Sequence, residues 1–558
     1  MPDYEVFNAT DHLVDRHVRD GRGDRLAVVC GSRSLTYAEL ADEVARVAAG
    51  LRTLSVRPEE RVMLCMADGI ELFTGILAAM RIGAVPVPVS TMVTGAELGK
   101  VLADSRARLL CVSVEFAAAA RAALEMAPEV AHVVVDGDDD VVSPVAVHRW
   151  SEFTEPDALP PHLTWADSPA LWMYTSGTTG RPKGAMHRHA SIRHVADCYG
   201  TGVLGVTPED RCLSVAKLFF AYGLGNSCFF PLSVGATAIL ERARPTPAMI
   251  ADRVIADRPT LFFAVPTFYA ALLNSDIPDD TFASVRQGVS AGEPLPAVVA
   301  SRFANRFGVE ILDGIGSTEA LHIFLSNRPG RVRPSSSGTP VPGYEVQIRD
   351  DDGDLVEAAG RPGHLYLNGP SIASGYWCRH ETTRRVFQGE WLRTGDTYVR
   401  NDDGTYSCLG RSDDMLKAGG IWVSPAEVEE RLLAHPDVAE AAVVAAPDEV
   451  GLDKPVACVV PVAGHVIDPG QLTSWCRDGL AAFKRPRAVI PVAELPKTAT
   501  GKIRRNVLRT QVHDALTGPA IADLTGSPVA DFAAPPVADL AAPPVADFAG
   551  PSVVDEPV

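Results

Sequence analysis

The spacing of apolar residues alternates between two patterns along the N-terminal part of the chain. Short apolar runs of strand length, such as RVMLCMA at 61–67 and AVPVPVS at 84–90, are separated by segments whose apolar residues recur every three to four positions. The clearest helical segment is TYAELADEVARVAAGLRTL at 36–54. Strands that alternate with helices in this way favour parallel sheets with helices packed on their faces, which is an α/β fold.

The same alternation continues along most of the chain. Residues 26–36 are expected to form two short strands, with further strands near 110 and 132. From 170 to 325 the expected order is a strand, a glycine-rich loop, a helix, and then strands that include LFFAVP at 261–266. After 338, short apolar runs separated by turns, such as GHLYLNG at 363–369, predict a β-rich subdomain.

A change of pattern near residue 412 predicts a domain boundary. Beyond it, SPAEVEERLLAHP at 424–436 and LTSWCRDGLA at 472–481 have helical spacing, and a strand is expected between them. These elements predict a compact α+β domain of about a hundred residues, which is a usual domain size. We therefore expect a large N-terminal domain over 1–412 and a small C-terminal domain over 413–513.

The last segment, 514–558, has a different composition. The pentapeptides PVADF, PVADL and PVADF begin at 528, 536 and 544, which is an eight-residue repeat. Frequent proline opposes helices and sheets, and the segment has little aromatic surface to bury. It is therefore expected to be a disordered acidic tail, with a docking motif as the alternative.

Composition and charge narrow the class of protein. Hydrophobic residues make up 46% of the 558 residues and charged residues 22%, which is typical of a soluble globular protein with a sizeable core. The formal net charge of -19 argues against nucleic acid and anionic membranes as partners, although it allows a local positive site for a phosphate ligand. The ten cysteines include no C-x-x-C pair, and the N-terminus has no apolar signal segment, so we expect reduced thiols in the cytoplasm.

One uncharged stretch is long enough to cross a bilayer. It runs from Leu218 to Leu240. However, Gly223, Pro231 and Gly235 interrupt it, so a loop, a short helix and a strand near a pocket are the better interpretation.

The segment Tyr174–Gly184, YTSGTTGRPKG, has the composition of a phosphate-binding loop. Its glycines allow backbone N–H groups to approach an anion, its hydroxyls add donors, and Lys183 adds a positive charge. The alternative is a surface turn rich in small polar residues. It is not a Walker A loop, because Pro182 stands where that motif has its second glycine.

Three further motifs offer charged groups at turns. Glu319, in GIGSTE at 314–319, is a candidate magnesium ligand, although such a segment is also a common helix start. Asp396, in WLRTGD, is expected to follow a turn and to accept the hydroxyls of a ribose. Lys502, in PKTATGKIRR, is expected on an exposed loop. Each motif alone is more often structural than functional.

In combination and in this order, these motifs resemble the adenylate-forming acyl-CoA synthetase superfamily. The motifs are YTSGTTGRPKG, GIGSTE, TGD, GRSDD and PKTATGK, and the resemblance covers nearly all of 5–510. Within the superfamily, the segments at 217–237, 317–330 and 419–429 look like the benzoate-CoA ligase branch. The resemblance implies a large N-terminal domain and a small, mobile C-terminal lid, with the active site between them.

The resemblance also implies nucleotide-binding residues. The ATP phosphates would be held by Thr175, Ser176, Gly177, Thr178, Thr179, Gly180 and Lys183. The remaining ATP contacts would come from Gly314, Ile315, Gly316, Ser317, Thr318, Asp396 and Arg411. Among them Thr318 would reach the α-phosphate, and Asp396 with Arg411 the ribose, while Glu319 would bind Mg²⁺. Ile315 stands where broader relatives carry an aromatic residue against the adenine, and the benzoate branch shares this aliphatic residue.

The acyl pocket implied by the resemblance is a flat, mostly apolar slot for one ring. Its lining would be Phe220, Ala221, Tyr222, Gly223, Ser290, Ala291, Gly292, His322 and Ile323. Tyr222 or His322 could meet a ring substituent, whereas the alternative is that the aromatic residues are plain core. Benzoate and its hydroxy, amino and fluoro derivatives therefore all stay open as substrates.

The implied reaction has two steps. The acid and ATP would form an acyl-adenylate and pyrophosphate, with Lys502 bridging the carboxylate and the α-phosphate, and coenzyme A would then take the acyl group and release AMP. Between the steps the lid would turn about Asp413, withdrawing Lys502 and opening a coenzyme A channel past Gly419 and Gly420.

Other functions stay open. An aryl-adenylating enzyme that loads a carrier protein would share every ATP motif, and a luciferase-like enzyme or a binding-only scaffold has less support. The sequence does not specify the oligomeric state, so a homodimer is also compatible with it.

Overall fold

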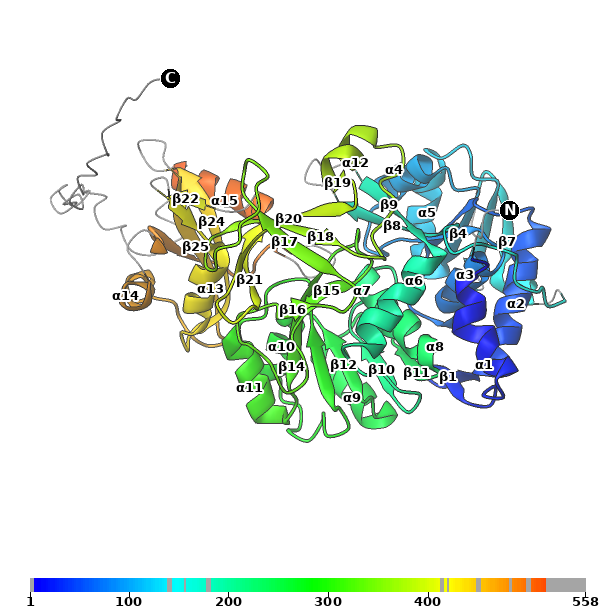
Figure 1. Ribbon diagram of the computed structural model, residues 1–558, viewed down its shortest axis with the longest axis horizontal. Coiled ribbons are helices and arrows are strands. Elements are labelled where there is room, and N and C mark those ends of the chain that lie inside the picture. The colour runs from blue at the N-terminus through cyan, green and yellow to red at the C-terminus, as the bar shows by residue number, and fades with distance from the viewer. Residues whose placement is uncertain are drawn as a thin grey trace, which may run out of the picture.

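The computed structural model of the protein describes residues 5–137, 143–154, 157–176, 182–411, 416–418, 421–447, 453–480, 484–497 and 503–517. Figure 1 shows two large sheets with their helices in the N-terminal part of the chain, and a smaller module of C-terminal elements at the other end of the molecule. The β-rich elements β17, β18 and β20 lie between these two parts.

The larger sheet has nine strands in the described residues, in the order β16-β15-β14-β13-β12-β10-β11-β1-β2. The six strands from β14 to β1 are parallel, and antiparallel strands extend the sheet at both ends. The bounds are β1 (Leu26–Cys30), β2 (Arg33–Thr36), β10 (Arg211–Ser214), β11 (Thr237–Leu240), β12 (Leu261–Ala264), β13 (Gln287–Ser290), β14 (Ile311–Gly316), β15 (Ile323–Ser326) and β16 (Thr339–Pro340). Because parallel strands all end at one edge of a sheet, the segments after β10, β12, β13 and β14 meet along that edge.

A second sheet has five parallel strands in the described residues, in the order β4-β3-β5-β6-β7. Their bounds are β3 (Arg61–Cys65), β4 (Val85–Pro88), β5 (Leu109–Ser113), β6 (His132–Asp136) and β7 (Ala146–Arg149). Strands β4 and β5 are buried along their whole length, as expected for a parallel sheet covered on both faces. The parallel sheets predicted from the apolar pattern are confirmed.

Helices cover both sheets. Those of the N-terminal part are α1 (Arg16–Arg19), α2 (Tyr37–Thr53), α3 (Ile70–Arg81), α4 (Gly95–Ser105), α5 (Ala117–Leu124), α6 (His189–Val195), α7 (Ala221–Leu224), α8 (Phe230–Val234), α9 (Pro247–Asp257), α10 (Pro266–Leu273), α11 (Ala297–Phe307) and α12 (His380–Val386). Helix α2 begins at a reciprocal cap, in which Thr36 and Glu39 each accept a hydrogen bond from the other's backbone N–H. Its buried face, with Leu40 and Val44, packs into the same core as α3, so the helix predicted over 36–54 is confirmed.

The glycine-rich loop is followed by a strand, which differs from the predicted helix. Strand β8 (Pro169–Ser176) pairs antiparallel with β9 (Pro182–Arg188), and α6 begins only at His189. Proline and glycine at 182 and 184 disfavour a helix at this point, and pairing with β8 satisfies the backbone instead. The glycine-rich loop therefore connects two antiparallel strands.

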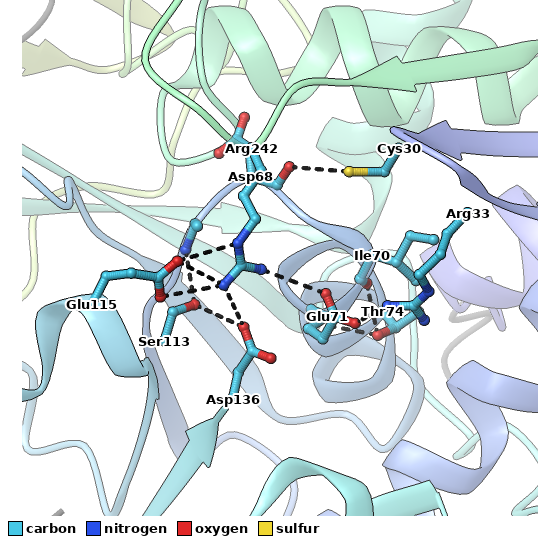
Figure 2. A network of polar contacts seen from close by, with 11 residues as sticks. Cys30, Arg33, Asp68, Ile70, Glu71, Thr74, Ser113, Glu115, Asp136 and Arg242 are labelled. Carbon is cyan, nitrogen blue, oxygen red and sulfur yellow. Dashed lines mark hydrogen bonds and ion pairs between the residues drawn. The ribbon is translucent and has the colours of Figure 1, made fainter. Parts of the chain in front are cut away.

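A cluster of charged residues joins the two N-terminal sheets. Arg242, just beyond β11, forms ion pairs with Glu115 and Asp136 at 3.0 Å and lies 3.8 Å from Glu71. Glu115 and Asp136 lie at the carboxyl ends of β5 and β6, and Glu71 lies on α3 (Figure 2). Arg33 on β2 also pairs with Glu71. The cluster therefore holds one end of the nine-stranded sheet against the five-stranded sheet.

The β-rich subdomain predicted after residue 338 is confirmed. It is a five-stranded antiparallel sheet. Its strands are β17 (Glu345–Arg349), β18 (Gly363–Asn368), β19 (Phe387–Gln388), β20 (Trp391–Arg400) and β21 (Tyr406–Arg411).

The C-terminal module is a small α+β unit. Its strands are β22 (Leu416–Ala418), β23 (Ile421–Val423), β24 (Val438–Pro447), β25 (Asp453–Pro461) and β26 (Ala488–Pro491), and its helices are α13 (Pro425–Leu433), α14 (Pro469–Gly479) and α15 (Arg505–Thr517). Helices α13 and α14 pack with Val443 of β24, whereas α15 packs with the next residue, Val444, on the opposite face of the sheet. Helix α15 continues past the boundary expected at 513, and the rest of the repeat segment, 518–558, lies outside the described residues.

The uncharged stretch 218–240 forms α7, α8 and β11, so it is broken into short elements as expected. Over the described part of the chain, no helix combines the length and the apolar character needed to cross a membrane.

Replacing Phe303 on α11 tests the packing beneath the nine-stranded sheet. Its ring is fully buried and lies 4.9 Å from the ring of Tyr269 and 5.3 Å from that of Phe282, centroid to centroid. We expect Phe303→Ala to reduce the free energy of unfolding by about 3–5 kcal/mol, because it leaves a cavity. Urea denaturation followed by circular dichroism measures this loss. Val466→Ala is the control, since Val466 is 88% exposed, and an equal loss in both variants would contradict the assignment.

Candidate active site

Residues 317–322, which connect β14 to β15, lie at the centre of the candidate site. The chain reverses here so that β15 pairs antiparallel with β14. Gly316 permits this close approach, because a Cβ at that position would lie 2.6 Å from the carbonyl oxygen of His322. The turn is also held from outside, since the Ala373 N–H donates to the Glu319 carbonyl at 2.8 Å.

His187 on β9 fixes the same turn. Its Nε2 lies 2.8 Å from the carbonyl oxygen of Thr318. Because a carbonyl can only accept, Nε2 carries the proton. Burial lowers the pKa of His187 to about 4, so the ring is neutral near pH 7. This residue was not among the sequence-predicted ones, and it links the glycine-rich hairpin to the turn that carries Glu319.

Glu319, Tyr376 and Lys183 come together on the other side of this turn. The Tyr376 hydroxyl donates to Glu319 Oε1 at 2.6 Å, and Lys183 Nζ lies 5.1 Å from the centre of the Tyr376 ring. Burial and the Glu319 carboxylate raise the pKa of Tyr376, so its hydroxyl remains a donor. A carboxylate and an ammonium group thus flank one aromatic ring at the base of the glycine-rich loop.

The hairpin register places Thr175 opposite Lys183. The loop residues Gly177, Thr178, Thr179 and Gly180 lie outside the described residues, as does the side chain of Ser176. The same holds for Lys502, Asp413, Gly419 and Gly420. The roles expected for these residues stay predictions.

Asp396 lies within β20 rather than after a turn, which corrects the expectation from the sequence. The strand accommodates Gly395 in a left-handed conformation, with φ of +80°, and continues on both sides of it. Arg411, opposite Asp396 in β21, donates from Nη1 to Asp396 Oδ1 at 3.0 Å. The Asp396 side chain is 11% exposed and that of Arg411 52%, so the pair presents charge at the molecular surface.

Tyr222 and His322 lie together on the acyl side of the site. Their ring centroids are 5.5 Å apart, and Phe230 packs edge-on against His322 at 4.6 Å. The Tyr222 hydroxyl donates to the carbonyl of Val289, the residue before Ser290, at 3.0 Å. Gly225 allows His322 to approach α7, since a Cβ there would lie 2.3 Å from the imidazole.

The protonation state of His322 follows from its partners. Nε2 lies 3.1 Å from Asn226 Oδ1 and 3.3 Å from the Tyr222 carbonyl oxygen, and both of these oxygens are acceptors. Burial lowers the pKa of His322 to about 3. Nε2 therefore carries the proton of a neutral imidazole.

The remaining predicted residues lie along the carboxyl edge of the nine-stranded sheet. Ser290 ends β13, with Ala291 and Gly292 after it, while Gly314, Ile315 and Gly316 end β14 and Ile323 begins β15. Phe220 directly precedes α7, and Ala221 and Gly223 lie within it. Ser317 Oγ accepts the Ala320 N–H at 3.1 Å, so part of its role is to cap the turn.

Three buried polar atoms at this edge have no hydrogen-bond partner among the described residues. They are Ser290 Oγ, Asp313 Oδ1 and His322 Nδ1. Burial raises the pKa of Asp313 well above its usual range. Such orphaned atoms fit a polar ligand at the ends of β13 and β14. Asp313 was missed from the sequence, although a carboxyl in a buried strand is itself an unusual signal.

The site can be tested for magnesium. No cluster of three or more possible ligands is found within the described residues. Mg²⁺ is usually held by one or two carboxylates together with substrate phosphates. The carboxylate of Glu319, as a single protein ligand, therefore fits such an ion.

A cavity of about 580 Å³ lies elsewhere, beside the charged cluster of Figure 2. Five carboxylates and three arginines line it, and none of the sequence-predicted residues does. Its excess of negative charge opposes a polyphosphate, so it is not the candidate nucleotide site.

Comparison with known proteins identifies the class. The model of the AMP-binding enzyme family matches residues 14–377, and the AMP-binding enzyme C-terminal domain matches residues 427–502. The chain belongs to this family of AMP-binding enzymes, which confirms the superfamily recognised from the motifs.

Two similar relatives are named for aromatic acids. Benzoate–CoA ligase of Thauera aromatica is 45% identical, covering 91% of this chain and 96% of that protein. A 4-hydroxybenzoate–CoA/benzoate–CoA ligase of Rhodopseudomonas palustris is 42% identical, covering 90% and 94%.

Solved structures agree with the fold. An anthranilate CoA ligase in complex with anthranoyl-AMP superposes with a TM-score of 0.87 at 38% identity, covering 93% of this chain and 99% of that one. A benzoate CoA ligase from Burkholderia xenovorans gives 0.83 at 43% identity, covering 90% and 100%. The predicted α/β class, with a large N-terminal and a smaller C-terminal domain, is confirmed.

Removing the Tyr376 hydroxyl tests whether it orients Glu319. We expect Tyr376→Phe to raise the Mg²⁺ concentration needed for half-maximal ATP-dependent turnover by about tenfold, because a hydrogen bond to a charged group contributes about 1.5–3 kcal/mol. The measurement is a magnesium titration of pyrophosphate release. Tyr366→Phe on β18 is the matched control. An unchanged titration in Tyr376→Phe would show that Glu319 does not depend on this contact.

Proposed function

We propose that the protein is a benzoate-CoA ligase, which activates benzoate with ATP and transfers the acyl group to coenzyme A, giving benzoyl-CoA, AMP and pyrophosphate. One observation carries the proposal. The turn 317–322 presents Glu319 toward Tyr376 and Lys183 at one end, and His322 toward Tyr222 at the other. The turn thus borders both the polar side, where phosphates would bind, and the aromatic slot. This arrangement would bring an aromatic acid next to a nucleotide, as the joining of the two requires.

The first step needs alignment and positive charge rather than a protein nucleophile. A carboxylate that attacks the α-phosphate is an anion approaching an anion, so positive groups must be aimed where negative charge builds. Lys183 and the glycine-rich loop, Thr175 to Gly180, would hold the leaving phosphates. Mg²⁺ on Glu319 would neutralise charge on the departing pyrophosphate.

The other nucleotide contacts are assigned by position along the sheet edge. Thr318 would contact the α-phosphate, and Asp396 with Arg411 the ribose hydroxyls. Gly314 to Ser317 would line the adenine, with Ile315 against its face. Asp313, whose Oδ1 has no partner among the described residues, would accept from a donor of the bound nucleotide.

The Tyr222 hydroxyl and His322 Nε2, two donors of the acyl slot, are paired within the protein, which fits an unsubstituted ring. Tyr222 donates to a backbone carbonyl, and His322 Nε2 faces acceptors in Asn226 and in the backbone. A plain benzoate ring would therefore leave neither donor unpaired, whereas Ser290 Oγ and His322 Nδ1, which have no partner among the described residues, would be available to a ring substituent. Phe220, Ala221, Gly223, Ser290, Ala291, Gly292 and Ile323 would form the rest of the slot.

The second step would depend on a movement of the two domains expected on either side of residue 412. The C-terminal domain, 413–513, would act as a lid that turns about Asp413, withdraws Lys502 and admits coenzyme A past Gly419 and Gly420. All ten cysteines are free thiols, which supports a reducing, cytoplasmic setting. A homodimer stays compatible with this scheme, and transfer to a carrier protein is the alternative that is not favoured.

The panel experiment measures acid-dependent pyrophosphate release with benzoate and its hydroxy, amino and fluoro derivatives, with and without coenzyme A. We expect the highest kcat/KM with benzoate, and release of free thioester only with coenzyme A. Preference for a fatty or amino acid would contradict the assignment. An acyl-adenylate discharged only by a phosphopantetheinylated carrier protein would support the alternative.

The role of Lys502 is tested by separating the two steps. We expect Lys502→Ala to lower the adenylation rate by about 100-fold or more, because it removes a charge from the transition state, and to spare thioester formation from supplied benzoyl-AMP. Rapid-quench assays of each half-reaction make the measurement, with Lys454→Ala as a control on β25. Loss of both half-reactions in Lys502→Ala would refute the division of labour.

A further inference from the structure

A hydrogen bond joins the two domains next to Lys502. Glu293 lies between β13 and α11 in the N-terminal domain, directly after Gly292. Its Oε1 accepts the backbone N–H of Ile503 at 3.1 Å, across 210 positions of sequence. Ile503 is the residue that follows Lys502, so the N-terminal domain holds the C-terminal one at this point.

Ile503 is in turn fixed to the body of its own domain. It forms an antiparallel bridge with Lys497, and the Arg504 N–H donates to the Pro496 carbonyl at 2.7 Å. These contacts join the two ends of the segment that carries Lys502. Whatever holds Ile503 therefore also holds Pro496 and Lys497.

The next residue extends the connection into the domain core. Arg505 donates from Nη2 to Glu429 Oε2 at 3.0 Å and from Nη1 to the Val443 carbonyl at 3.0 Å. Glu429 is on α13 and also accepts the Val443 N–H at 2.7 Å. Helices α13 and α15 and strand β24 are thus locked together, so the module moves with Ile503 as one unit.

Charge supports docking at the same place. Glu97 on α4 is another N-terminal carboxylate near this segment. Hydrogen bonds from Thr94 lower the pKa of Glu97, and the charges of Lys100 and of Arg504 act in the same direction. A second described hydrogen bond between the domains, from Ser335 Oγ to Glu430 Oε1 at 2.6 Å, involves exposed side chains. It joins α13 rather than the residue beside Lys502.

We propose that Glu293 is a positioning residue for the adenylation step, which holds the C-terminal domain against the N-terminal one by accepting the Ile503 N–H. This role rests on the function proposed above. In the proposed scheme Lys502 acts in adenylation alone, so a contact of the neighbouring Ile503 would assist that step and not coenzyme A transfer.

The test compares half-reactions in Glu293→Ala, Glu293→Gln and wild type. Adenylation is measured as benzoate-dependent pyrophosphate release in single turnover, and thioester formation as discharge of supplied benzoyl-AMP by coenzyme A. We expect Glu293→Ala to slow adenylation about tenfold or more and to change thioester formation less than about twofold. Glu293→Gln should keep most of the adenylation rate, because its amide oxygen can accept the same N–H.

Glu430→Ala is the matched control, since it removes a different described contact between the domains, the one with Ser335. We expect both of its half-reactions to stay within about twofold of wild type, because an exposed contact contributes little. Equal slowing of both half-reactions in Glu293→Ala, or a raised KM for benzoyl-AMP, would overturn the proposal by showing a structural or nucleotide-binding role. An unchanged adenylation rate in Glu293→Ala would also overturn it, as would a Glu293→Gln variant as slow as Glu293→Ala. If wild type adenylates none of the acids, the function proposed above fails, and the role of Glu293 fails with it.

Discussion

The close approach of β15 to β14 is the constraint on which the candidate site depends. β14 is the last of the parallel strands, and the chain must reverse after it without moving away from the carboxyl edge of the sheet. Glycine at 316 makes the reversal sterically allowed, and His187 holds the turn from the neighbouring hairpin. The turn 317–322 can therefore supply the Glu319 carboxylate to one side of the candidate site and the His322 imidazole to the other.

The electrostatics of the molecule depend on where each charge is paired. The chain as a whole is strongly acidic, with a net charge of -19, yet the groups at the candidate phosphate side are held in specific local pairs. Tyr376 stands between Glu319 and Lys183, and Arg411 balances Asp396. Short-range pairing of this kind makes a phosphate site compatible with an overall charge that would repel nucleic acids.

The alternation of strands and helices could be predicted from the sequence because buried parallel strands are continuous apolar runs with little ambiguity. The strand after the glycine-rich loop could not, because β9 (PKGAMHR) has neither a continuous apolar run nor a strict alternation, and it is stabilised by pairing with β8, which no local pattern records. The sequence predicts a turn before Asp396. In the structure, strand β20 accommodates Gly395 and continues on both sides of it. Tyr376, His187 and Glu293 carry no local signal, since their importance lies in partners more than fifty positions away.

The cysteines have a consequence for acyl chemistry. Burial raises the pKa of Cys65 and of Cys111 to about 12, and that of Cys212 and Cys228 also rises. The nucleophile toward a mixed anhydride is the thiolate, and these side chains are kept almost wholly as thiols at neutral pH. A protein that generates a reactive acyl-adenylate thereby keeps these thiols from intercepting it. Burial of these four cysteines thus removes them as competing nucleophiles and favours transfer of the acyl group to an acceptor that arrives from solution.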